Sequence, residues 1–99
     1  MDPIFLEIIL KSSDMTEVAL HRDEVEESLK DALREAQCGE VTGGGAGSDV
    51  VIVDVEIWAA SDFRDALALI RRVLKELKVP DSTLIYRHKP EKIAYSLSD

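Results

Sequence analysis

The sequence has little cysteine, no long apolar run and no basic start. Its one cysteine, Cys38, can form neither an internal disulfide framework nor a cysteine-rich zinc site. A membrane-spanning helix needs about 20 apolar residues, whereas the apolar stretch at residues 4–10 is short and contains Glu7. The opening Met1-Asp2-Pro3 lacks the basic residues of a secretory signal. We therefore expect a protein of the reducing cytoplasm.

Positive charge is also scarce. The 12 Lys and Arg residues oppose 20 Asp and Glu residues, which gives a formal net charge of −8. Nucleic-acid binding depends largely on neutralising phosphates, so this balance argues against a nucleic-acid partner. A hydrophobic content of 45% argues against disorder, and 99 residues suit one domain.

Residues 3–10 are apolar and rich in β-branched side chains, which is typical of a largely buried strand. The polar stretch from Lys11 to Thr16 is expected to form a loop. Side chains of a strand alternate between its two faces. The expected faces are Ile4, Leu6, Ile8 and Leu10 on one side, and Phe5, Glu7 and Ile9 on the other.

A helical period begins at Asp23, which we expect to be the N-cap of an amphipathic helix. Gly39 is the expected stop signal. The helix carries an excess of acidic residues over basic ones. Its apolar stripe consists of Val25, Leu29, Ala32, Leu33 and Ala36.

All five glycines lie between positions 39 and 47. Residues 40–42 before the main cluster are expected to form a short strand, and residues 49–58 after it a long one. The glycines Gly43, Gly44, Gly45 and Gly47 are then expected to form a flexible hairpin loop. Val51, Val53, Val55 and Ile57 share one face of the long strand, and Val50, Ile52, Asp54, Glu56 and Trp58 share the other.

A second helix is expected after the capping residues Ser61 and Asp62, and Pro80 prevents its continuation. Residues 82–87 are expected to form a last strand. The tail at 88–99 is either a fifth strand or a mobile arm, so the domain proper spans residues 1–87. The inner stripe of the helix is Phe63, Ala66, Leu67, Ile70, Val73, Leu74 and Leu77.

The order strand, helix, strand, strand, helix, strand predicts the split βαβ, ferredoxin-like plan of the α+β class. In that plan both helices cover one face of a four-stranded antiparallel sheet. The opposite face stays open, and the first and third strands are neighbours. The residues expected on this open face are Phe5, Glu7, Ile9, Val50, Ile52, Asp54, Glu56 and Trp58.

Two interpretations of this face stay open: a partly solvated surface, or a protein-binding surface of apolar groups rimmed by charge. A binding surface serves either self-association or capture of another protein. The acids of this face and of the first helix would steer a basic partner, although solubility explains acids equally well. A symmetric dimer would bring Asp54 and Glu56 against like charges.

No residue carries a decisive catalytic or metal-binding pattern, so we expect neither an enzyme nor a cofactor. Asp54 and Glu56 lie two residues apart on one strand face and could act as a carboxylate pair in acid–base catalysis or metal binding, but two such acids are commonplace. His21 and His88 lie too far apart in the sequence for a metal-ligand spacing. Cys38 has no evident base to activate it. The basic stripe on the second helix lacks the interleaved aromatic residues of an RNA-binding patch.

The glycine cluster also suggests a phosphate loop, but such loops lead from a strand into a helix, whereas this one leads into a strand. The cluster leaves an alternative function open. A small-molecule-binding or regulatory domain would use it as a loop that closes over a ligand.

Four segments suggest a family. They resemble small bacterial proteins, some of which are similar to immunity proteins of polymorphic toxin systems, and they are the string from Cys38 to Gly45, the segment 54–56 that it leads into, the segment 68–74 and the segment 79–83. The resemblance spans residues 38–85 and implies a bacterial ferredoxin-like domain without a catalytic motif. Together with the open face, it favours a non-enzymatic interaction module with a basic, toxin-like partner.

Overall fold

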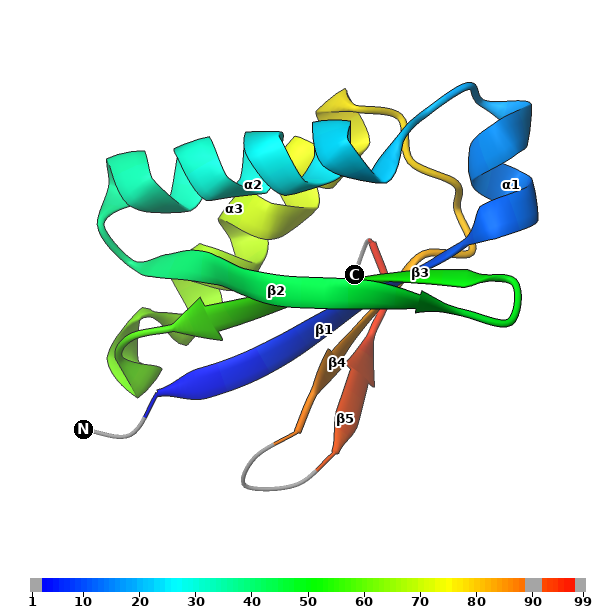
Figure 1. Ribbon diagram of the computed structural model, residues 1–99. Coiled ribbons are helices and arrows are strands. Elements are labelled where there is room, and N and C mark those ends of the chain that lie inside the picture. Colours follow the sequence, from blue (N-terminus) through cyan, green and yellow to red (C-terminus); the bar gives the residue numbers. More distant parts are fainter. Residues whose placement is uncertain (1–2, 89–91, 98–99) are drawn as a thin grey trace.

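The residues described in a computed structural model, 3–88 and 92–97, form five strands and three α-helices (Figure 1). In chain order these are β1 (Ile4–Lys11), α1 (Ser12–Glu17), α2 (Arg22–Ala36), β2 (Gly39–Gly47), β3 (Val50–Ile57), a 3₁₀ turn (Ala60–Asp62), α3 (Phe63–Glu76), β4 (Leu84–Arg87) and β5 (Ile93–Tyr95).

The strands make one antiparallel sheet in the order β2-β3-β1-β4-β5. β1 lies in the middle and pairs with β3 and β4, as expected for neighbouring first and third strands. The expectation of four strands is wrong, because β5 pairs with β4 and adds a fifth. The described part of the tail is therefore a strand followed by residues 96 and 97, and the other tail residues lie outside the described part. The α+β arrangement is compatible with a ferredoxin-like plan extended at one edge.

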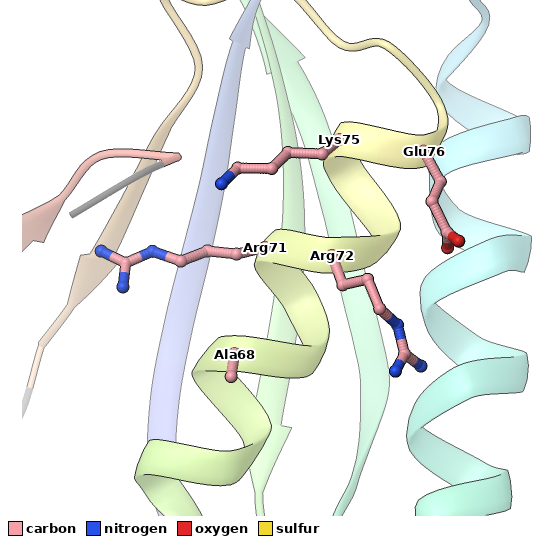
Figure 2. Close-up of a pocket in the computed structure, with 5 residues that line it drawn as sticks. All are labelled: Ala68, Arg71, Arg72, Lys75 and Glu76. Atoms are coloured by element: carbon pink, nitrogen blue, oxygen red, sulfur yellow. The ribbon is translucent and has the colours of Figure 1, made fainter.

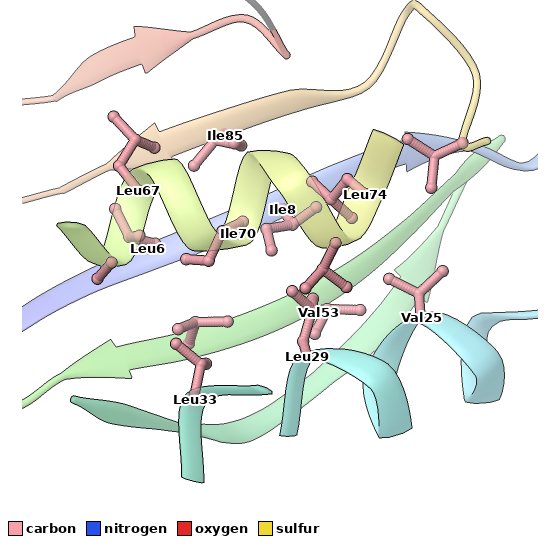
Figure 3. Close-up of a cluster of buried hydrophobic side chains, with 14 of the residues drawn as sticks. Leu6, Ile8, Val25, Leu29, Leu33, Val53, Leu67, Ile70, Leu74 and Ile85 are labelled. Atoms are coloured by element: carbon pink, nitrogen blue, oxygen red, sulfur yellow. The ribbon is translucent and has the colours of Figure 1, made fainter. Parts of the chain in front are cut away.

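The core lies between the sheet and the helices α2 and α3, which cover the same face (Figure 1). Most of the expected inward residues are buried, and Ile8, Leu10, Val53, Val55 and Ile57 are each 0% exposed. The expectation is wrong for Ala36 at the end of α2, which is exposed, and Ala32, Val51, Phe63 and Leu77 are only half-buried. Figure 3 shows side chains from both helices meeting those of the strands. The labelled residues are Val25, Leu29 and Leu33 of α2, Leu67, Ile70 and Leu74 of α3, and Leu6, Ile8, Val53 and Ile85 of the sheet.

The expected loop at 11–16 is wrong, because Lys11 belongs to β1 and α1 follows it. Hydrogen bonds to residues far away in the sequence hold α1 in place. The amide of Ser12 donates to the backbone oxygen of Asp49 at 3.0 Å, and Ser82 Oγ donates to Asp14 Oδ2 at 2.6 Å. Met15 is buried in the core. A polar local sequence could not reveal these long-range contacts.

Both expected ends of α2 are shifted. His21, not Asp23, is the N-cap residue, and no side-chain hydrogen bond caps the helix. At the other end Gln37 has φ 56°, and the amides of Gln37 and Cys38 donate to the carbonyls of Arg34 and Leu33. This Schellman geometry ends the helix at a glutamine, so the expected stop, Gly39, instead begins β2.

The entry into α3 partly matches the expectation. Asp62 is the N-cap residue, but its side chain makes no capping hydrogen bond. Ser61 lies in the preceding 3₁₀ turn and does not cap the helix. The strand expected from residue 82 is β4, and it begins at Leu84.

The expected glycine-rich loop is also wrong. Gly43, Gly44, Gly45 and Gly47 all lie in β2, which pairs with β3 along its length, with an irregularity between Val41 and Gly43. The turn falls on residues 48 and 49 instead. Pairing with the long apolar strand β3 therefore overrides the weak strand preference of glycine.

Candidate functional site

The sheet face away from α2 and α3, called the open face here, brings the expected residues together. Directly opposed residues of neighbouring strands share a face. Across β1 and β3 the register opposes Phe5 to Glu56, Glu7 to Asp54, and Ile9 to Ile52. These six residues therefore form three adjoining rows, and Trp58 follows directly after β3.

Carboxylates face one another in two of the cross-strand pairs of this face. Glu7 lies opposite Asp54 across β1 and β3, and Glu40 lies opposite Glu56 across β2 and β3. Like charges directly opposite each other destabilise a sheet. Sequence reasoning did not place Glu40 here, because it depends on the register of β2. The fold thus places four acids in two like-charge cross-strand pairs, of which Glu7 also contacts the ring of His88.

Large apolar side chains flank these acids. Trp58 is 45% exposed and Phe5 is 39% exposed, which makes them two of the few large apolar side chains left open to solvent. Val50, Ile9 and Ile52 are half-buried on the same face. Exposed apolar area rimmed by charge is typical of a contact surface.

β4 adds residues to the open face that sequence reasoning missed. Leu84 lies opposite Ile9 and Tyr86 lies opposite Glu7. The strand period would have found both, because Ile85 between them is fully buried and points to the helices. His88, an exposed residue as expected, lies with its Nε2 at 2.7 Å from Oε1 of Glu7.

The described end of the chain turns toward the helices. The Tyr95 ring contacts the Phe63 ring of α3 at a centroid distance of 5.7 Å, and Leu97 is buried in the core. Arg71 Nε donates to the backbone oxygen of Ser96 at 2.9 Å. Residues 92–97 therefore do not cover Trp58, which stays 45% exposed.

A basic groove of about 520 Å³ lies on the outer side of α3. Figure 2 shows Arg71 and Lys75 extending to one side of the helix and Arg72 and Glu76 to the other, with Ala68 below them. Arg71 is held by Ser96 and lies 5.9 Å from the Tyr95 ring centre. The groove is separated from the open face by the sheet.

Within residues 3–88 and 92–97 no three His, Cys, Asp or Glu side chains are grouped so that they could hold a metal ion. Within the same residues no hydrogen bond or ion pair joins Asp54 or Glu56 to a histidine, because His88 contacts Glu7 instead. No helix of the same part has the length and apolar character of a membrane span.

Cys38 is a buried free thiol between α2 and β2. Burial raises the pKa of the Cys38 thiol, and the charges of Asp62 and Asp65 raise it further. A thiol held in its neutral form is a poor nucleophile. This environment fits a structural residue rather than a catalytic one.

Alkylation should report this environment. At pH 8 we expect iodoacetamide to modify Cys38 at least about tenfold more slowly in the folded protein than in urea. The folded state keeps the proton to a higher pH than the unfolded state, so stability should fall as the pH rises above about 8.5. Mass spectrometry and urea titrations measure the two effects. Equal alkylation rates in both states would contradict the burial of the thiol.

Comparisons with protein-family models, with curated proteins and with solved structures found no match for this chain.

Proposed function

We propose that this chain is a non-enzymatic interaction module with a ferredoxin-like plan, and that its open face binds a basic protein. The observation that carries the proposal is the pair of opposed carboxylates, Glu7 with Asp54 and Glu40 with Glu56. Such pairs weaken the isolated sheet, and a cationic partner would relieve their repulsion. Residues 38–85 resemble small bacterial proteins, some of which are similar to immunity proteins, and this resemblance suggests a toxin-like bacterial partner.

The exposed aromatic residues supply the rest of the surface. Aromatic side chains are enriched in interface cores, and charge steers the encounter. Trp58 and Phe5 would provide apolar anchors beside the four acids. Two copies meeting face to face would instead oppose acids to acids, which disfavours a homodimer through this surface.

The alternative function, a ligand-binding domain with a closing glycine loop, loses its basis. Gly43, Gly44, Gly45 and Gly47 are paired with β3 as a strand and form no loop that could close over a ligand.

A titration of the ¹⁵N-labelled protein with a peptide of alternating lysine and leucine tests the proposal. Helix α2 carries six acids of its own, so unspecific attraction would shift its amides as much as those of the open face. We expect the largest shifts at β1 and β3. A peptide of alternating glutamate and leucine should cause no comparable shift.

Matched variants distinguish binding at the open face from attraction by the net charge of the protein alone. Asp54→Asn/Glu56→Gln and Asp31→Asn/Glu35→Gln remove the same charge, the first pair on β3 and the second on exposed positions of α2. We expect the first variant to weaken binding of the lysine peptide by about tenfold or more, and the second to change it little. Equal weakening by both variants would refute the open face as the site.

A further inference from the structure

The two edges of the sheet differ strongly. β5 is three residues long, and the residue after it, Ser96, already accepts a hydrogen bond from Arg71. β2, at the other edge, runs for nine residues from Gly39 to Gly47. Alternate residues of an edge strand direct their N–H and C=O groups away from the sheet. Within the described residues no strand pairs with the outer side of β2, so this edge offers a row of backbone donors and acceptors.

The devices that normally block such an edge are scarce on β2. Native edges are protected by charged side chains, by proline or by shortness. Residues 41–47 contain no charge and no proline, and residues 44–47 are all exposed. The devices present on β2 are the charge of Glu40 near its start and the irregularity between Val41 and Gly43, since bulges also protect edges.

We infer that the outer edge of β2 pairs with an extended strand of the basic partner. The inference rests on the proposed function for the charge of that partner. Glu40, at the start of β2, is exposed and opposes Glu56. A Lys or Arg of an added strand, placed beside Glu40, would meet both carboxylates. Main-chain hydrogen bonds would provide affinity, and alternate side chains would provide specificity.

The open-face side of β2 also defines the other side chains of the added strand. Gly43 and Gly45 oppose Asp54 and Ile52, and a Cβ at either glycine would have no heavy atom within 4 Å. An aromatic side chain on a neighbouring strand covers an edge glycine well. The partner strand therefore carries a basic residue followed by aromatic residues at alternate positions.

A second copy of this chain fits the edge less well. Symmetric antiparallel pairing of two β2 strands would place residues 43–47 of one copy opposite residues 43–47 of the other. Glycine would then oppose glycine or alanine, and no side chain would cover the open space above Gly43 and Gly45. It would also join two chains of net charge −8.

A nine-residue peptide, Lys-Thr-Tyr-Thr-Tyr-Thr-Tyr-Thr-Lys, is a direct probe because it presents lysine and tyrosine on one face in either chain direction. With the intact protein we expect alternate amides of β2 to gain protection from hydrogen exchange. Two N-methylated peptides serve as controls, one methylated at the four threonines and one at the three tyrosines. Each loses the N–H donors of the methylated residues on one edge only, since alternate residues of a strand donate to opposite sides.

One N-methylated peptide should bind at least about tenfold more weakly than the parent peptide, and the other should keep most of its affinity. Equal binding by both N-methylated peptides would overturn strand pairing while leaving the open-face proposal intact. No binding of the parent peptide would also overturn it, whereas the lysine-leucine titration separately decides the proposed function. A dimer joined through β2, seen by ultracentrifugation and by hydrogen exchange, would overturn the choice of partner.

Discussion

Replacing Ile8 with alanine is expected to lower the free energy of unfolding by about 2–5 kcal/mol. Ile8 is 0% exposed in the middle strand, where α2, α3 and β3 all contribute neighbours (Figure 3). A cavity at this point cannot collapse easily, because rigid elements surround it. Small domains are stable by only about 5–15 kcal/mol, so the variant should show a much lower urea midpoint by circular dichroism.

The next residue is the matched control. Ile9 has the same side chain on the same strand, but it lies half-buried on the open face. Ile9→Ala should cost about 1 kcal/mol or less, because less apolar area leaves the core. Similar losses for both variants would contradict a core on one side of the sheet.

Replacing Gly44 with alanine should lower the free energy of unfolding by about 2–4 kcal/mol. Gly44 has φ +156°, and a Cβ there would overlap the Arg22 guanidinium and the backbone oxygen of Ile52. Arg22 Nε itself donates to that oxygen at 3.2 Å. The added methyl group would therefore force a change in the contact between α2 and the sheet. Thermal unfolding measures the loss.

Gly43→Ala separates this local clash from a general effect of glycine. The position next to Gly44 has open space at its Cβ. Alanine there should leave stability unchanged or raise it by about 0.5–1 kcal/mol, since the unfolded chain loses freedom. If both variants lost stability equally, the close approach of Arg22 would not be the cause.

The interior of the fold was predictable from the sequence because its patterns are local. The strand period assigns Ile8 inward and Ile9 outward, and the helical period assigns Leu29 and Ile70 inward. All four assignments agree with the observed burial. The neighbouring positions of β1 and β3 follow from connectivity, which also placed Glu7 beside Asp54.

The errors arose where contacts distant in sequence decide the local structure. Glycine propensity predicted a loop at Gly43–Gly47, but pairing with β3 keeps this segment extended. The α1 segment looked like a loop because its partner, Asp49, lies far along the chain. One missed open-face residue belongs to the same class, because Glu40 enters the face through the register of β2, which no local period specifies. Tyr86 is different, since the alternation around the buried Ile85 could have placed it.

The strict alternation along β1 and β3 has an engineering consequence. Phe5, Glu7, Ile52, Asp54 and Glu56 can be randomised together without altering the side chains that pack under the helices. A display library built on these positions would vary one patch of the sheet face while the packed core beneath it stays constant. The domain is thereby suited as a small scaffold for selected binding reagents.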